Sequence, residues 1–189
     1  TGQSCFKMFT LEYTRLKLKE ITMSAIRDPL FALLDRAGIA HTTHDHDAVF
    51  TVEQSASIKA HLPGGHTKNL FLKDKSGQLF LLCALGDTVV PVNKLHKVLE
   101  CKRLSFGKAE IMEEVLGVQP GSVTLFALMN DIDKRVQLIL DQALLAHDIV
   151  NFHPLENTAT TAIKSADMEV FAKATGHHPL VLDFTTIQT

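Results

Sequence analysis

Residues 64–82, GGHTKNLFLKDKSGQLFLL, contain two apolar runs separated by a polar, glycine-containing turn. The pair of glycines at the start permits backbone conformations that residues with a Cβ adopt only at a cost. Leu70–Leu72 and Gln78–Ala84 predict two antiparallel strands, with Lys73–Gly77 as the hairpin turn between them. Four polar residues stand where the loop enters the first strand, a common location for chemistry: His66, Thr67, Lys68 and Asn69.

The segments around this hairpin predict short helices and strands without a regular strand–helix alternation. The first helix is expected to have Asp28 as its N-cap, Pro29 at its first position and Gly38 just past its end. Further helices are expected at 51–60, 91–100, 108–116 and 167–176, the last with Asp167 as N-cap. Strands are expected at 41–47, 102–107, 122–128, 136–140, 148–154, 157–163 and 180–184.

This order of elements predicts one α+β domain with a mixed, largely antiparallel sheet and helices packed around it. We expect the domain to cover residues 23–189, because Met23 resembles an ordinary start and the following residues form the first helix. Residues 1–22 differ from the rest and are interpreted as an N-terminal extension or a cloning remnant.

Composition excludes several classes of protein. The chain has 189 residues, is 46% hydrophobic and carries a net charge of −2, which suits one globular core. No apolar run approaches the roughly 18 residues of a membrane span, and we expect no membrane partner. The three cysteines lack C-x-x-C spacing, and Cys83 is expected to be a buried apolar residue. These features favour a cytoplasmic protein without disulfides.

The charges are distributed unevenly. Residues 59–108 hold nine Lys or Arg against three Asp or Glu, a local charge of +6. Residues 109–189 hold four against eleven, a local charge of −7, and residues 1–58 hold six against seven. The basic middle segment is either a phosphate-binding surface or an ordinary solvated one. The chain lacks the pI above about 9 that is typical of a DNA-binding domain, and no DNA partner is expected.

Several familiar catalytic and binding motifs are incomplete or absent in this sequence. His41, His44 and His46 have a spacing that resembles metal ligands, but a strand places only the last two on one face, so we predict no metal site. Ser122 is not part of a G-x-S-x-G motif. Neither a phosphate-binding loop nor a dinucleotide fingerprint is present, and no cofactor is expected.

The segment NFHPLENTATT, residues 151–161, gathers hydrogen-bonding groups at the start of a strand. Pro154 restricts the backbone next to His153. Asn157, Thr158, Thr160 and Thr161 offer donors and acceptors there, although threonine is also common in strands for its β-propensity alone.

Taken together, FTVEQSA, GGHTKNLFLKDKSGQLFLL, FGKAEIMEEVLGVQPGSVTLFAL, HPLENTATTAI and GHHPLVLDF resemble the YbaK/prolyl-tRNA-synthetase editing-domain superfamily. The resemblance covers roughly residues 27–185. TKNLFLKD, HPLENTATT and GHHPLVLDF are most similar to its free-standing, alanine-specific ProX branch. The resemblance implies hydrolysis of alanine that has been esterified to proline tRNA by mistake, without metal or cofactor.

The resemblance also implies which residues form the site. Lys68 matches the functional lysine, Asn69 its polar neighbour and His153 a histidine that faces the amino acid. Gly121 and Ser122 match the PGS turn of the family, and the predicted catalytic set consists of these five. The predicted substrate-binding set is His66, Thr67, Asn157 and Thr158. The implied partners are the acceptor end of a mischarged tRNA and, transiently, prolyl-tRNA synthetase.

Elementary chemistry constrains the roles. A lysine is ordinarily protonated near neutral pH, so Lys68 is expected to supply charge rather than act as a base. Water would attack the ester, with the backbone N–H groups beside Gly121 and Ser122 or the Lys68 ammonium as donors to the developing oxyanion. Selectivity against proline is expected from steric exclusion, since one methylene is worth only about 1–3 kcal/mol of attraction.

Three alternatives remain open from the sequence: a deacylase specific for cysteine or serine, a non-catalytic nucleic-acid-binding module, and a metal-dependent hydrolase that uses the three histidines.

Overall fold

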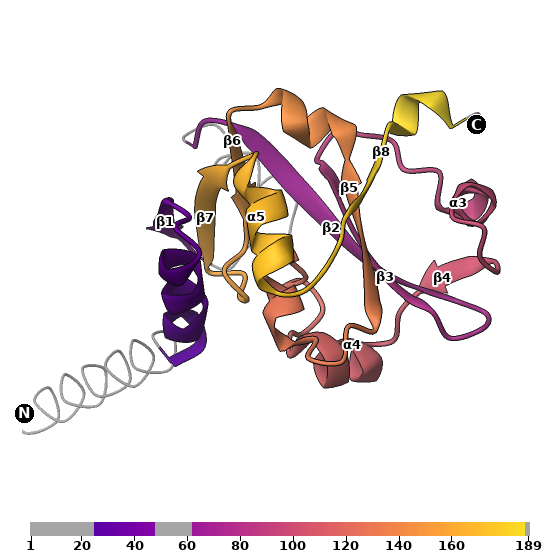
Figure 1. Cartoon of the computed structure of the whole chain (residues 1–189), viewed down its shortest axis with the longest axis horizontal. Helices are drawn as coiled ribbons and strands as arrows, with labels where there is room; N and C mark the ends of the chain where they lie inside the picture. The colour runs from indigo at the N-terminus through magenta and orange to yellow at the C-terminus, as the bar shows by residue number, and fades with distance from the viewer. Residues whose placement is uncertain (1–24, 48–61, 188–189) are drawn as a thin grey trace, which may run out of the picture.

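β2 (Gly65–Asp74) and β3 (Leu79–Leu85) form an antiparallel hairpin in the middle of the sheet (Figure 1). The structure is a computed structural model that describes residues 25–47 and 62–187. The Asp74 carboxylate closes the turn by accepting hydrogen bonds from the backbone N–H of Ser76 at 2.8 Å and of Gln78 at 2.9 Å. The predicted hairpin is confirmed.

The described strands form a mixed sheet in the order β1-β7-β6-β2-β3-β5-β8, and β4 pairs with β2 beside this path. Four pairings are antiparallel (β1/β7, β6/β7, β2/β3, β2/β4) and three are parallel (β2/β6, β3/β5, β5/β8). The expected α+β class and mixed sheet are confirmed, and antiparallel pairs outnumber parallel ones by one. The remaining strands are β1 (His41–Asp45), β4 (Leu104–Phe106), β5 (Val136–Asp141), β6 (Ile149–Phe152), β7 (Ala159–Lys164) and β8 (Leu180–Leu182).

Each face of the sheet carries its own apolar core, because side chains alternate along a strand. Phe71 and Leu81 join the larger core, under a helix at residues 25–36, α4 (Ala109–Leu116), η1 (Leu125–Asn130) and α5 (Asp167–Ala174). Leu72 and Leu82 join the smaller core on the opposite face, with Leu95 of α3 (Val92–Val98) and Phe184 of η3 (Phe184–Thr186). A further short helix, η2 (Gln142–Ala146), follows β5.

The strand predicted at 122–128 is wrong. Residues 125–128 are fully buried and belong to the 3₁₀ helix η1, which begins after Thr124. The Thr124 hydroxyl caps this helix by accepting a hydrogen bond from the N–H of Phe126. A short, wholly apolar run fits a buried helix as well as a buried strand, so periodicity does not separate the two.

Two predicted helix starts also need correction. Residues 25–28 are already helical, so Asp28 is not the N-cap, whereas Gly38 does follow the helix end with φ +70°. Ala166 is the N-cap of α5, and Asp167 is its first helical residue. The predictions for residues 1–22 and for a helix at 51–60 lie outside the described residues. None of the described helices is long and apolar enough to span a membrane.

Candidate active site

The sheet has an opening along one edge of β2. β6 pairs with this strand only at residues 65–66 and β4 only at 72–74, so the edge at 67–70 has no strand partner within 25–47 and 62–187. The C=O of Phe71 points to this edge, since it accepts from Gly107 N at 2.9 Å. Asn69, two residues earlier, directs its backbone groups the same way. Within the described residues, this stretch of the β2 edge is therefore not used by strand pairing.

Lys68 lies on β2 at the level of this opening, and its ammonium group is fixed by backbone carbonyls that follow β3, the strand on the other side of β2. Its Nζ donates to the C=O of Gly86 at 2.9 Å and to the C=O of Thr88. Among the described residues, no carboxylate lies within ion-pair distance of this group. Carbonyl oxygens orient the ammonium without neutralising it, so Lys68 presents a fixed positive charge.

Asp141, at the end of β5, holds the loop that supplies these carbonyls. One carboxylate oxygen accepts from Leu85 N at 3.1 Å and from the Thr88 hydroxyl at 2.5 Å. The other oxygen accepts from Ala143 N at 3.0 Å, and the residue is 2% exposed. Sequence reasoning missed Asp141, although a carboxylate that ends the apolar run VQLIL is a usable signal.

Asn69 does not join Lys68 in one cluster, because consecutive residues of a strand point to opposite faces. Asn69 lies with Thr67 on the face of the larger core, and its Nδ2 donates to the Thr67 hydroxyl at 3.4 Å. Its Oδ1 is buried and has no hydrogen-bond partner among residues 25–47 and 62–187. The Thr67 hydroxyl itself donates to the C=O of Asn151 in β6 at 2.7 Å. Asn69 thus offers an unused acceptor close to the opening.

His153 follows β6 at the level of Lys68. β6 runs parallel to β2, and each of the two residues lies two positions past the last pair, His66 and Asn151. His153 Nδ1 contacts the C=O of Ala159 at 3.2 Å. A carbonyl only accepts, so Nδ1 carries the proton and Nε2 is left as an acceptor in the neutral ring. Burial lowers the pKa of His153 and outweighs the hydrogen bond to the C=O of Ala159, which raises it, so the neutral form is favoured.

The loop from 153 to 158 is fixed from outside by Arg27, which sequence reasoning also missed. The guanidinium donates to Glu156 and, at 2.5 Å, to Asp45. Burial alone would lower the pKa of Arg27, but the hydrogen bonds to these carboxylates raise it overall. The Thr158 hydroxyl donates to the same Glu156 at 2.9 Å, and Asn157 is half-buried beside it.

Three predicted site residues are engaged elsewhere. The His66 Nε2 contacts the C=O of Leu62 at 2.9 Å, so its ring is turned toward the preceding loop. Gly121 has φ +92° in a turn before η1, and the Ser122 N–H donates to the C=O of Gln119 at 3.0 Å. No hydrogen bond within the described chain joins this turn to Lys68, Asn69 or His153. The predicted Ser122 donor is therefore occupied by the turn.

The histidine cluster is dispersed. His41 stacks on Phe31 with ring centroids 4.9 Å apart, and His44 is exposed. His46 lies beyond the end of β1 and contacts the Thr160 hydroxyl at 2.9 Å. In the part of the chain that the structure describes, no group of three or more metal-ligating side chains could hold an ion.

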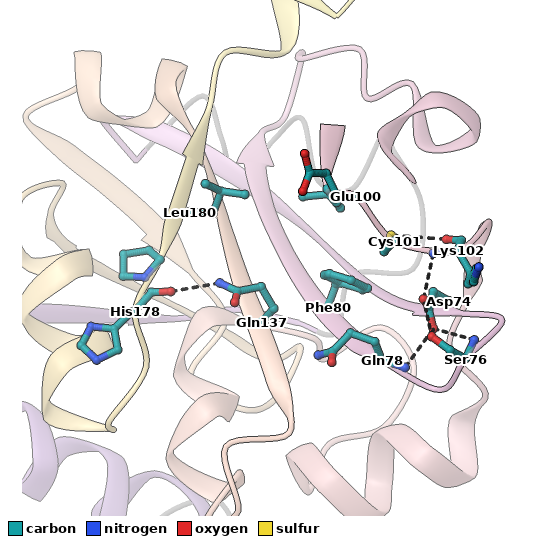
Figure 2. A pocket seen from close by; sticks show the side chains of 12 residues that line it. Asp74, Ser76, Gln78, Phe80, Glu100, Cys101, Lys102, Gln137, His178 and Leu180 are labelled. Carbon is teal, nitrogen blue, oxygen red and sulfur yellow. Dashed lines mark hydrogen bonds between the residues drawn. The ribbon is translucent and has the colours of Figure 1, made fainter. Parts of the chain in front are cut away.

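A hollow of about 700 Å³ lies at the other end of the hairpin (Figure 2). Its wall includes Asp74, six residues along β2 from Lys68, which corresponds to about 20 Å of extended strand. The Asp74 carboxylate of this hollow already serves the fold, since it accepts from the backbone N–H groups of Ser76, Gln78 and Lys102. Size alone does not make it the better candidate.

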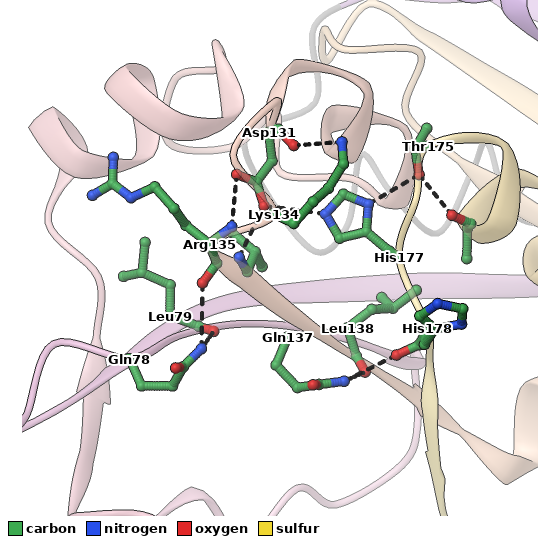
Figure 3. Close-up of polar contacts among 12 residues, drawn as sticks. Gln78, Leu79, Asp131, Lys134, Arg135, Gln137, Leu138, Thr175, His177 and His178 are labelled. Carbon is green, nitrogen blue, oxygen red and sulfur yellow. Dashed lines mark hydrogen bonds and ion pairs between the residues drawn. The ribbon is translucent and has the colours of Figure 1, made fainter.

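A second polar network is fully buried between η1 and the end of α5 (Figure 3). His177 contacts the Asp131 carboxylate with Nε2 at 3.1 Å and the Thr175 hydroxyl with Nδ1 at 3.1 Å. That hydroxyl also donates to carbonyls of α5, and Asp131 accepts from the backbone N–H groups of Arg135 and Val136. Every member has partners within the protein, which indicates a structural role.

Comparisons with known proteins identify the family of the chain. A model of the aminoacyl-tRNA editing domain matches residues 46–171. The mouse protein named prolyl-tRNA synthetase associated domain-containing protein 1 is 38% identical over 85% of this chain and 98% of its own. The prolyl-tRNA editing protein ProX of Acetoanaerobium sticklandii is 30% identical over 80% of this chain and 93% of its own.

A solved structure shows the same fold. The crystal structure of a proposed trans-editing enzyme for prolyl tRNA synthetase superposes with a TM-score of 0.64 at 17% identity, over 84% of this chain and 96% of that one. The extent of the family match and the identity to its curated relatives establish more than the fold: this chain belongs to the aminoacyl-tRNA editing domain family.

Proposed function

We propose that this protein is an aminoacyl-tRNA deacylase that removes alanine from mischarged proline tRNA, with its active site at the opening beside β2. The observation that carries the proposal is the Lys68 ammonium, held by two backbone carbonyls with no carboxylate in contact among the described residues. Relatives named for prolyl-tRNA editing support the tRNA and the reaction class. Lys68 then binds the terminal phosphate or ribose, or stabilises the oxyanion.

The remaining groups at the opening suit ester hydrolysis by water. The backbone N–H of Asn69, directed to the open edge, replaces Ser122 as the candidate oxyanion donor, because the Ser122 N–H is already bonded. The free Nε2 of neutral His153 accepts a hydrogen bond from the attacking water or from the amino group of the ester. The vicinal 2′-hydroxyl of the substrate shares the proton transfer.

The basic middle segment provides a path for the tRNA. Five of its cationic side chains are exposed around the hairpin, α3 and β4: Lys75, Lys97, Lys102, Arg103 and Lys108. Contacts of such side chains with phosphates release counterions, so the logarithm of binding affinity is expected to fall linearly as the logarithm of the salt concentration rises.

Selectivity for alanine rests on steric exclusion by the loop that carries His153. A pocket that accepts a methyl group and rejects the pyrrolidine ring discriminates better than attraction, which gives about 10- to 200-fold for one methylene. The size of the amino-acid pocket also decides between specificity for alanine and specificity for cysteine or serine, whose side chains are larger.

The test is release of amino acid from proline tRNA charged separately with alanine, cysteine, serine or proline. We expect rapid release of alanine, little release of proline, and slower hydrolysis when the terminal ribose lacks its 2′-hydroxyl. Release of cysteine or serine in preference to alanine would support the proposed reaction class but refute the proposed specificity for alanine. Tight binding of the tRNA without release of any amino acid would establish a binding module instead. Loss of activity with a chelator would favour the metal-dependent alternative.

A further inference from the structure

A buried ion pair joins the helix at residues 25–36 to the loop that carries His153. Arg27 donates to Glu156 through Nε, and the two side chains are 9% and 14% exposed. Its second partner, Asp45 at the end of β1, is 70% exposed. The contact with Glu156 is therefore the one shielded from solvent, and it is made between residues 129 positions apart in the chain.

The loop needs such a clamp because its backbone is strained. Leu155, between His153 and Glu156, has φ +69°, a left-handed conformation that a bulky residue without special contacts rarely adopts. Strained residues persist only where the surroundings fix them, and they cluster at functional sites. Glu156 is fixed twice, by Arg27 and by the Thr158 hydroxyl at 2.9 Å.

The end of β1, which Arg27 also contacts, is joined to the C-terminal flank of the loop. The C=O of Thr158 accepts from His46 N at 2.9 Å, and His46 directly follows Asp45, the other partner of Arg27. His153 contacts the C=O of Ala159, the residue after Thr158, so a shift of this flank moves the ring. Arg27 itself touches neither His153 nor the open edge of β2.

We infer that Arg27 is a positioning residue that sets the selectivity of the site for alanine over proline by holding the 153–158 loop in its strained shape. The inference rests on the proposed deacylase function. A steric filter works only if its wall does not yield, because a wall that moves outward admits the larger ring and still accepts the methyl group. Loosening the clamp therefore lowers selectivity more than it lowers alanine release.

The experiment compares kcat/KM for alanyl and prolyl esters of proline tRNA in Arg27→Gln and Glu156→Gln. The second variant keeps an oxygen that can accept from Arg27 and so removes charge with less risk to folding. We expect the alanine-to-proline ratio to fall about tenfold or more, within the range that a methylene-sized difference spans. Arg135→Gln is the matched control, since it breaks the exposed pair with Glu114, and its ratio should equal that of the wild type. Equal losses with both esters would overturn the inference.

A second readout does not depend on activity. Nitrogen NMR of the His153 ring in the wild type and in both variants follows the hydrogen bond of Nδ1 and the titration of the ring. Release of the loop exposes the ring, so its pKa should rise toward the ordinary value in the variants. An unchanged His153 signal in folded variants would sink the positioning role. If the wild type releases neither amino acid, the proposed function fails, and the NMR comparison still decides whether Arg27 positions His153.

Discussion

Two polar regions of this protein differ in whether their hydrogen bonds are complete. The network of Asp131, His177 and Thr175 is buried, and each of its groups has partners within the chain (Figure 3). On β2, within the part of the chain that the structure describes, Lys68 contacts carbonyls but no carboxylate, and Asn69 Oδ1 has no hydrogen-bond partner.

This difference separates a structural element from a candidate site. Buried polar groups are normally hydrogen-bonded, so the unpaired acceptor of Asn69 on one face of β2 and the Lys68 cation on the other are two candidate contacts for a ligand. A Thr-His-Asp chain, in contrast, resembles a catalytic triad but uses its hydroxyl to cap the end of α5. Between these two regions, completeness of hydrogen bonding therefore discriminates better than residue type does.

The largest effect on stability is expected from a change in the buried network of Asp131, His177 and Thr175. Asp131→Ala removes the carboxylate that pairs with His177 and accepts from two backbone N–H groups. Breaking a buried pair by removing one partner costs about 3–5 kcal/mol, so the free energy of unfolding should fall by that amount. Urea denaturation measures it. The folded fraction should release alanine at the wild-type rate, and a loss of activity per folded molecule would show that the network belongs to the site.

The next largest effect is expected from acid, which should lower the stability contributed by the Asp131 and Asp74 carboxylates. Burial opposes ionisation of Asp131, but the hydrogen bond with His177 and those from backbone N–H groups lower its pKa overall. Hydrogen bonds from Ser76, Lys102 and Gln78 likewise outweigh burial and lower the pKa of Asp74 to about 2.

Because both folded-state pKa values lie below the ordinary 3.8, their stabilisation is present above that pH and is lost as the pH falls toward 2. Urea midpoints at pH 5.5, 4 and 2.5 check this. The decline should be smaller in Asp131→Asn, and an equal decline would contradict the assignment.

Smaller effects on stability and on alanine release are expected from a substitution in the loop that orients Lys68. Thr88→Val removes the hydroxyl that donates to Asp141 and keeps the backbone carbonyl that accepts from Lys68. A hydrogen bond to a charged group is worth about 1.5–3 kcal/mol at most, and the bond from Leu85 N to Asp141 remains. Thermal unfolding should show a modest loss, and alanine release should slow a few-fold. Unchanged kinetics would mean that Lys68 does not depend on this loop.

Sequence patterns predicted the parts of this molecule that depend on local order. The hairpin at β2 and β3 follows from alternating apolar residues around a turn, and the motif segments led to the correct family. The 3₁₀ helix η1 was missed because four consecutive buried apolar residues carry no periodicity.

The contacts that define the site are long-range, which is why the pattern did not contain them. Lys68 contacts carbonyls of residues 18 and 20 positions away in the sequence, and Arg27 contacts Glu156, which is 129 positions away. One signal was available: Arg27 lies on the same helical face as buried Leu30 and Leu34, at spacings of three and seven. Because side chains alternate along a regular strand, the sequence also implied that Lys68 and Asn69 point to opposite faces of the sheet.

The most direct test of the account is alanine release from proline tRNA by Lys68→Ala, compared with wild type and with Lys164→Ala. Lys164 is exposed on β7, in the acidic part of the chain, and serves as the matched control. The account predicts a loss of about 10²–10³ in rate for Lys68→Ala, the effect of removing one oxyanion-stabilising group, with unfolding close to that of the wild type and Lys164→Ala unchanged. Wild-type alanine release by a folded Lys68→Ala protein would contradict it.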